Sequence, residues 1–175
     1  MSNLKEILER KRVCKSVWFM RQAGRYLPEF RKIRSQNQNF INLCLNSDLS
    51  SDITLQPIKR FDLDSAIIFS DILMVPYALN QNVEFIKDKG PVLEEFNFKK
   101  FLNNDKISFT QKLHPVYKAI QTTRKKLDVN KSLIGFIGAP WTLLIYMLGA
   151  KESKKDINYK KIKTKEFEVN LILDK

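Results

Sequence analysis

The sequence predicts an α/β protein in which short, buried parallel strands alternate with helices. Two observations support this prediction. The segments 16–20, 65–69 and 133–138 are apolar throughout, without the polar alternation of a half-exposed strand, which is typical of strands buried on both faces of a parallel sheet. Segments with the apolar spacing of helices separate these strands. A chain of 175 residues is also long enough to form one domain with a hydrophobic core.

The N-terminal elements follow from local patterns. Residues 3–12 place leucine and isoleucine on one side of an amphipathic helix, and residues 16–20 (SVWFM) read as a short buried strand. Glycine and proline bracket residues 21–28, so we expect a loop there, followed by a helical turn at 29–34.

A longer helix and a second strand are expected next. Ser47 or Asp48 can cap a helix that runs to about Phe61. Pro57 lies inside this helix, where a proline removes a backbone hydrogen bond, so we expect a kink or a restart. Residues 65–69 (SAIIF) then form a strand buried on both faces.

The central segment is more polar. Residues 83–86 (VEFI) are expected to form a strand or hairpin arm before Gly90-Pro91, and residues 94–112 to form a loop with a helical turn. Pro115 suits an early helical position, so a helix is expected from there through residues 116–127. The side chains expected to face inward are Val116, Ile120 and Leu127.

The C-terminal third repeats the order of strand and helix. Residues 133–138 (LIGFIG) are expected to form a buried strand, and Ala139-Pro140-Trp141 to begin the helix that follows. Residues 151–175 are rich in lysine and contain the apolar run 169–173 (VNLIL), which resembles a strand. This order of elements again favours a parallel α/β sheet.

Composition limits the possible classes of protein. The net charge of +12 permits an anionic partner, such as nucleic acid, a membrane surface or an acidic small molecule. Cys14, Cys44 and His114 are too few for a typical zinc site, so we expect two reduced thiols, an exposed histidine and no metal. The N-terminus lacks the apolar segment of a secretory signal and no run is long enough to span a membrane, which predicts a cytoplasmic protein.

Conspicuous side chains follow the three predicted strands. Arg21 and Arg25 follow the first strand, and Asp71 follows the second. The third ends on Gly138-Ala139-Pro140-Trp141, and Tyr146 lies about one helical turn beyond Trp141. In parallel α/β folds the carboxyl ends of the strands form the site, so these four side chains are expected to face one space. Each has a structural alternative: the two arginines lie on a solvated basic loop, Asp71 caps a turn, and Tyr146 belongs to the core.

Three stretches together resemble one known family. They are VWFMRQAGRYLPEFRKIR at 17–34, ITLQPIKRFDLDSAIIFSDILMVPYAL at 53–79, and LIGFIGAPWTLLIYM at 133–147. In order and spacing, residues 16–149 resemble the uroporphyrinogen decarboxylases. The RQAGRYLPE motif after a strand is the most specific of these signals.

The resemblance implies a fold and an activity. The family is a single-domain TIM (β/α)8 barrel that acts as a homodimer without a cofactor. It is a carboxy-lyase that converts uroporphyrinogen III to coproporphyrinogen III in haem biosynthesis, by removing carbon dioxide from acetate side chains. Its members are about twice as long as this chain. Residues 1–175 are therefore expected to form one truncated domain, the N-terminal half of a barrel, with little activity alone.

The resemblance also assigns site residues. Arg21, Gln22, Ala23, Gly24 and Arg25 match the family's substrate-binding loop. Asp71 matches the aspartate that contacts the pyrrole N–H groups and would stabilise a protonated pyrrole, Tyr146 matches a pocket tyrosine, and Arg34 is a further candidate for binding a substrate carboxylate. Arg21 would either deliver a proton or hold the leaving carboxylate. A hydroxyl residue and a histidine of the family pocket belong to the half that this chain lacks.

Departures and alternatives remain. Ile137 stands where the family has a small residue, and residues 148–154 replace a glycine-rich segment. One alternative is a basic nucleic-acid-binding module, which would need exposed aromatic residues on a basic face. The other is a related barrel, a corrinoid methyltransferase, which would need zinc ligands.

Overall fold

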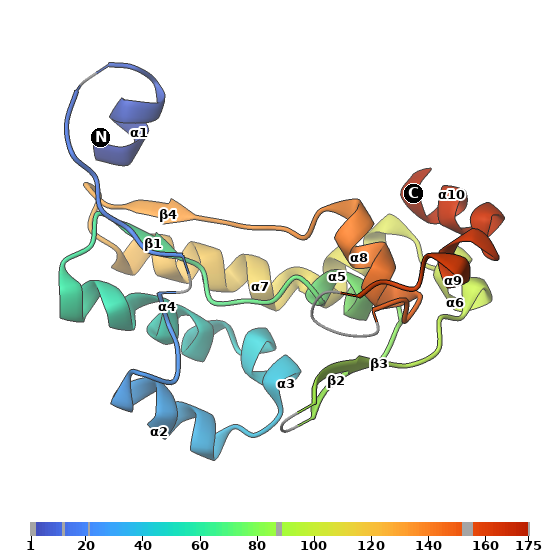
Figure 1. The fold of residues 1–175 in the computed structure, drawn as a ribbon. Helices are drawn as coiled ribbons and strands as arrows, with labels where there is room; N and C mark the ends of the chain where they lie inside the picture. Colours follow the sequence, from blue (N-terminus) through green and yellow to red (C-terminus); the bar gives the residue numbers. More distant parts are fainter. Residues whose placement is uncertain (1–2, 12, 21, 87–88, 152–155, 175) are drawn as a thin grey trace. The chain divides into compact units, whose positions relative to one another are not determined.

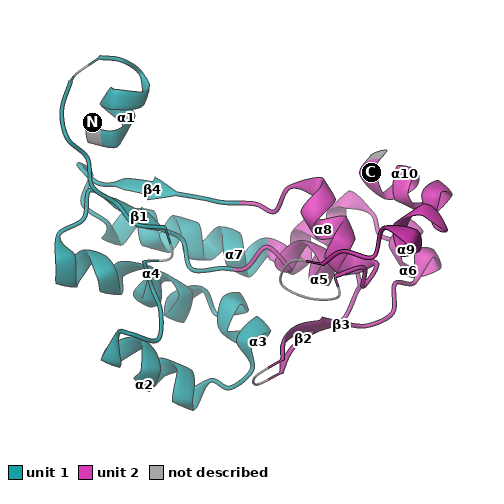
Figure 2. Ribbon diagram, viewed as in Figure 1, with its two compact units in different colours: residues 1–70, 114–136 teal, residues 71–113, 137–175 magenta. Residues whose placement is uncertain are grey.

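The computed structural model of this chain describes residues 3–11, 13–20, 22–86, 89–151 and 156–174. The chain folds into two compact units, and each is made of segments that are distant in sequence (Figure 2). Unit 1 comprises residues 1–70 and 114–136, and unit 2 comprises residues 71–113 and 137–175.

Unit 1 contains a small parallel sheet and its helices (Figure 1). Its elements are α1 (Asn3–Leu8), α2 (Pro28–Gln36), α3 (Phe40–Leu45), α4 (Ser47–Phe61), β1 (Ser65–Ile67), β4 (Ser132–Ile134) and the C-terminal part of α7 (Lys106–Lys126). Strands β1 and β4 pair in parallel, with Ala66 opposite Leu133. The parallel sheet predicted from the sequence is therefore confirmed.

Helix α4 holds β1 in place from one side. Leu55 of α4, Ala66 of β1 and Leu127 at the end of α7 form one buried apolar cluster. Beyond the strand, the Ser50 hydroxyl donates to the Phe69 carbonyl at 2.7 Å, and the Phe69 N–H donates to the Thr54 hydroxyl at 2.8 Å. The end of the β1 segment is thus fixed by helix side chains in place of a neighbouring strand.

The ends of α4 agree with the sequence, but its cap does not. The Asn46 side chain, and neither Ser47 nor Asp48, accepts from the Leu49 N–H at 3.0 Å. Asparagine is as good an N-cap as serine or aspartate, so the pattern left the choice open. The helix also continues through Pro57, so the expected restart is wrong, and the alternative of a kink stays a prediction.

Unit 2 contains a hairpin and short helices. Its elements are α5 (Met74–Ala78), β2 (Val83–Ile86), β3 (Gly90–Leu93), α6 (Phe98–Leu102), the start of α7, α8 (Pro140–Met147), α9 (Tyr159–Lys163) and α10 (Glu166–Asp174). Strands β2 and β3 are antiparallel, so the predicted hairpin is confirmed. Helix α8 begins after Ala139, as the sequence also predicts.

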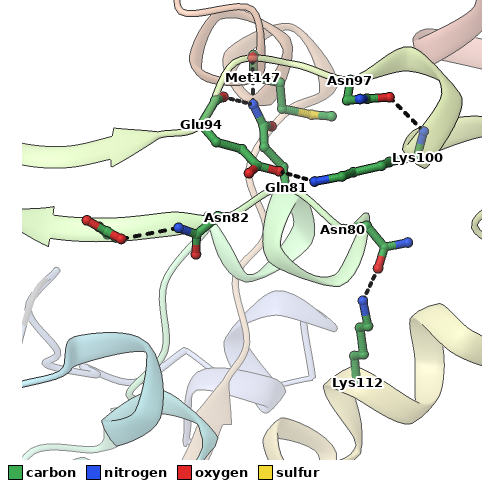
Figure 3. Close-up of polar contacts among 9 residues, drawn as sticks. Asn80, Gln81, Asn82, Glu94, Asn97, Lys100, Lys112 and Met147 are labelled. Atoms are coloured by element: carbon green, nitrogen blue, oxygen red, sulfur yellow. Dashed lines mark hydrogen bonds and ion pairs between the residues drawn. The ribbon is translucent and has the colours of Figure 1, made fainter.

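Amide side chains tie the hairpin of unit 2 to its helices (Figure 3). The buried Gln81 side chain donates from Nε2 to the carbonyls of Glu94 and Met147, each at 2.8 Å. Buried Asn104 donates to the Ala78 carbonyl at 2.6 Å. These bonds satisfy backbone carbonyls at the ends of β3, α8 and α5 that have no partner in a regular ladder.

Three of the predicted strands are wrong in extent or burial. The strand predicted at 65–69 is shorter, because β1 ends at Ile67. Residues 16–20 form no strand, and Val17, Trp18, Phe19 and Met20 are exposed. Strand β4 ends at Ile134, and Phe136 and Ile137 are exposed. An apolar segment becomes a buried strand only when a hydrogen-bonding neighbour and a covering layer are both present. The 16–20 segment has neither along most of its length within the described residues.

The predicted strand at 169–173 is also wrong, because these residues belong to α10. Val169 and Ile172, three residues apart, both pack onto the α8 cluster around Leu144 and Leu148. That spacing places both side chains on one face of a helix. The apolar run alone did not distinguish the side-chain period of a helix from that of a strand.

Other helix boundaries differ from expectation. Helix α1 ends at Leu8, the 29–34 turn is part of α2, and α7 begins at Lys106 with Pro115 inside it. The Asp105 carboxylate accepts from the Ser108 N–H at 2.6 Å and so caps α7 upstream of the proline. On the C-terminal part of α7 the buried side chains are Ala119 and Thr123. Leu127, directly after the helix, is buried as predicted, Val116 is half-buried, and Ile120 is exposed, contrary to the prediction.

Several smaller expectations are confirmed. Residues 22–27 form a loop, and His114 is exposed. Cys44 is buried and Cys14 is partly buried, both as thiols. None of the described helices combines the length and the apolarity needed to cross a membrane.

Candidate functional site

The predicted substrate-binding loop begins with a side chain that acts as part of the sheet. Gln22 is buried, and its Nε2 donates to the Ser65 carbonyl at 2.7 Å while its Oε1 accepts from the Ile67 N–H at 3.2 Å. A residue of a parallel strand would use its own N–H and C=O on these same two groups. The carboxamide of Gln22 therefore occupies the edge of β1 that faces away from β4.

The rest of the loop is a compact turn against the core of unit 1. Ala23 packs against the cluster formed by Leu27, Phe30, Leu43 and Ile53. The Gly24 carbonyl accepts from the Leu27 N–H at 3.0 Å, and the Arg31 guanidinium donates to the Arg25 carbonyl at 2.9 Å. These bonds fix the backbone of the loop and leave the Arg25 side chain exposed. Arg21 lies outside the described residues.

Arg34 has a local structural environment. Its guanidinium donates to the carbonyls of Asn37 and Gln38 just beyond the end of α2, and it lies 5.6 Å from the centre of the Phe40 ring. A cation at the C-terminus of a helix is favourable because the last carbonyls have no partners in the helix. These contacts account for Arg34 without a ligand, and its binding role stays a prediction.

Asp71 follows the β1 segment and opens unit 2. Its Oδ1 accepts from the Leu73 N–H at 2.9 Å, which fixes the carboxyl group over its own turn. Burial raises the pKa of Asp71 above its usual value, and the Leu73 hydrogen bond opposes the rise. The described surroundings therefore disfavour the negative charge, and a bound cation or set of N–H donors would restore it.

Tyr146 lies near the end of α8, where Lys151 contacts it. The Lys151 ammonium lies 2.5 Å from the Tyr146 hydroxyl oxygen and 4.5 Å from the centre of its ring. Because an ammonium group only donates, the tyrosine oxygen is the acceptor in this pair. The phenol O–H and the remaining ammonium protons can then donate to another group, such as a carboxylate.

The structure brings some of the predicted site residues together. Gln22, Ala23, Gly24 and Arg25 share one loop of unit 1, whereas Asp71 and Tyr146 belong to unit 2. Their convergence on one pocket stays a prediction. Within the described residues, no cluster of three or more histidine, cysteine, aspartate or glutamate side chains is placed to hold a metal ion.

Sequence reasoning missed two contributions to this region. Lys151 falls in the segment 148–154 that departs from the family pattern, and this departure was the available signal for its contact with Tyr146. The role of Gln22 as a substitute for a strand residue carried no signal, because a glutamine in a loop has no unique partner in the sequence.

Comparison with solved structures defines the class of fold. The chain superposes on a methyltransferase from Methanosarcina mazei with a TM-score of 0.70 and 14% sequence identity, covering 98% of this chain and 50% of that one. At this identity the similarity shows the fold alone. The fold is the N-terminal half of a (β/α)8 barrel, as predicted from the sequence.

Sequence comparison then identifies the family. The family model described as uroporphyrinogen decarboxylase (URO-D) matches residues 3–174, and the chain belongs to this family. It is 50% identical over 152 residues to the uroporphyrinogen decarboxylase of Neorickettsia sennetsu, covering 87% of this chain and 44% of the relative. It is 45% identical over 168 residues to that of Rickettsia canadensis, covering 91% of this chain and 48% of the relative. The chain thus spans about half the length of these curated relatives.

Proposed function

We propose that this chain supplies one half of the substrate pocket of a uroporphyrinogen decarboxylase. The reaction would remove carbon dioxide from the acetate side chains of uroporphyrinogen III and yield coproporphyrinogen III. The observation that carries the proposal is the 50% identity to a protein of that name over most of this chain. The proposal includes a homodimer of complete barrels, as the resemblance implies, and a cytoplasmic location, as expected from the N-terminal sequence.

Asp71 is the proposed electrostatic centre of the reaction. Loss of carbon dioxide requires an electron sink, and protonation of a pyrrole carbon creates a cation that can accept the electrons. A carboxylate held by the Leu73 N–H at 2.9 Å and raised in pKa by burial gains more from such a cation than a solvated carboxylate would. Asp71 would also accept hydrogen bonds from the pyrrole N–H groups.

The donors of the predicted site suit a substrate that carries many carboxylates. Arg25 is exposed on a loop whose backbone is held by Arg31, and a guanidinium group can pair with a carboxylate through two hydrogen bonds. In unit 2, the Tyr146 hydroxyl and the Lys151 ammonium offer two adjacent donors. Arg21 is proposed to act beside Arg25, either as proton donor or as a binding group.

A chimera tests the proposed function. This chain is fused to the part of the Neorickettsia sennetsu relative that it does not match, and release of carbon dioxide from uroporphyrinogen is measured. We expect the chimera to turn over uroporphyrinogen. Turnover by the Asp71→Asn chimera should be lower by two or more orders of magnitude, because it lacks the negative charge that stabilises the protonated pyrrole. A folded chimera without turnover contradicts the proposed function, and near-normal turnover of Asp71→Asn contradicts the role of Asp71. The Asp48→Asn chimera, altered at an exposed aspartate of unit 1, is the matched control.

A further inference from the structure

The loop at residues 22–26 of unit 1 is closed by the side chain of its own last residue. The Tyr26 hydroxyl donates to the Gln22 carbonyl, so the end of the loop is bonded to the backbone at its start. Ala23, Gly24 and Arg25 lie between these two residues. Because both ends are joined, the backbone that carries the Arg25 side chain has fewer conformations open to it.

The Tyr26 ring is held from outside the loop. It stacks on Phe61, the last residue of α4, with the ring centres 6.3 Å apart and an angle of 28° between the ring planes. One residue earlier, the Arg60 guanidinium donates to both carboxylate oxygens of Glu29, at 3.1 and 2.9 Å, and so ties α4 to the first turn of α2. Stacked rings and two-point ion pairs each favour one geometry. The Tyr26 hydroxyl therefore reaches the Gln22 carbonyl from a defined position.

The Tyr26 hydroxyl keeps the proton that this hydrogen bond requires. Partial burial raises the pKa of Tyr26 above its usual value, while the charge of Arg60 lowers it and that of Glu29 raises it. The usual pKa of a tyrosine is about 10, so a raised value leaves the phenol protonated at neutral pH. A carbonyl oxygen can only accept, and Tyr26 is the donor of the pair.

The 22–26 loop is thus anchored at two points and carries one exposed cation. The Gln22 side chain bonds the edge of β1, and the Gln22 carbonyl bonds Tyr26. The Arg25 carbonyl accepts from Arg31, whereas the Arg25 side chain is exposed. A binding group on a backbone that is already ordered loses less conformational entropy when its ligand arrives.

We propose that Tyr26 is a positioning residue, whose hydroxyl holds the 22–26 loop in the conformation in which Arg25 pairs with a carboxylate of the substrate. Tyr26 itself makes no contact with the substrate in this arrangement and acts through Arg25. The inference rests on the proposed function for the identity of the ligand. It adds a residue that the resemblance did not assign to the site.

A double-mutant cycle in the fused chimera tests this role. Tyr26→Phe keeps the ring that stacks on Phe61 and removes the hydroxyl. We expect KM for uroporphyrinogen to rise about tenfold with kcat unchanged, because a binding group is misplaced and the chemical step is untouched. Arg25→Ala should raise KM at least as much. In the Arg25→Ala chimera, Tyr26→Phe should change KM no further, since the two residues act as one unit.

Tyr117→Phe is the matched control, because Tyr117 is an exposed tyrosine of α7 in the same unit and lies outside the loop. It should leave both KM and kcat unchanged. Circular dichroism should be the same for all of these chimeras, because every substituted side chain is exposed.

Three results overturn the positioning role: an unchanged KM in Tyr26→Phe, a fall in kcat in place of a rise in KM, and a rise in KM that persists in the Arg25→Ala chimera. In an active chimera these results leave the proposed function intact. A folded chimera without turnover contradicts the proposed function, and the same cycle is then measured in the dissociation constant of uroporphyrinogen. If the unchanged chimera does not bind uroporphyrinogen, the positioning role is overturned as well.

Discussion

Two apolar segments of unit 1, SVWFM at 16–20 and SAIIF at 65–69, read alike in the sequence and fold differently. The second contains β1, pairs with β4 and is covered by α4, so that Ser65, Ala66 and Ile68 are buried. The first forms no strand, and its apolar side chains are exposed. The difference lies in their surroundings, because both segments have the composition of a buried strand.

The comparison teaches that apolar composition gives a segment its capacity for burial, while neighbours decide whether it is buried. β1 has a strand on one edge, the Gln22 carboxamide on the other and helix hydroxyls at its end. Every one of these groups comes from a different part of the chain. Residues 17–20 contact the sheet through Val17, whereas the side chains of Trp18, Phe19 and Met20 are exposed.

The largest difference in stability between the two segments should come from placing a charge in each of them. Ala66→Asp buries an unpaired carboxylate between α4 and the sheet, which should lower the free energy of unfolding by more than about 3 kcal/mol. Phe19→Asp should change it by less than about 0.5 kcal/mol, because Phe19 is already exposed. Urea unfolding followed by circular dichroism measures both values. Similar losses for the two variants would show that the segments are equally buried.

An intermediate loss of stability should follow from removing the Gln22 carboxamide, which takes the place of a neighbouring strand at the edge of β1. Gln22→Leu leaves the Ser65 carbonyl and the Ile67 N–H buried without their partner, which should lower the free energy of unfolding by about 2–4 kcal/mol. Gln36→Leu, at an exposed position of α2, is the matched control and should change it by less than about 0.5 kcal/mol. Hydrogen exchange of the 65–69 peptide should also accelerate in Gln22→Leu. Unchanged exchange there would contradict the assigned role of Gln22.

The smallest effect concerns Asp71, directly after the buried segment. Burial raises its pKa in the folded chain above the reference value of 3.8, so the folded state binds the proton more tightly than the unfolded state does. Stability from this group is therefore fully present below the unfolded pKa and is lost as pH rises through the folded pKa. Relative to Asp71→Asn, which keeps an acceptor for Leu73, the unchanged chain should lose stability between acidic and neutral pH. Urea unfolding at several pH values measures the difference, and a constant difference would contradict the raised pKa.

Much of the fold followed from local pattern. The hairpin, the bounds of α4 and the start of α8 were predictable because turn residues, caps and apolar spacing act within a few residues of each other. The start of α7 was not, because Pro115 is a good first residue of a helix and gave no sign that the helix begins upstream at Lys106. The helix at Glu166–Asp174 was missed because a short apolar run fits the side-chain period of a helix and that of a strand equally well.

The candidate site was predictable as a set of residues and only partly as an arrangement. The sequence determined the family, the parallel sheet and the residue types that suit a polycarboxylate substrate, because these depend on identity and order along the chain. Tertiary structure decided that Gln22 completes the edge of β1, that burial raises the pKa of Asp71 and that Lys151 contacts Tyr146. It also decided that SAIIF is buried and SVWFM is exposed, because burial depends on partners from distant parts of the chain that no local pattern records.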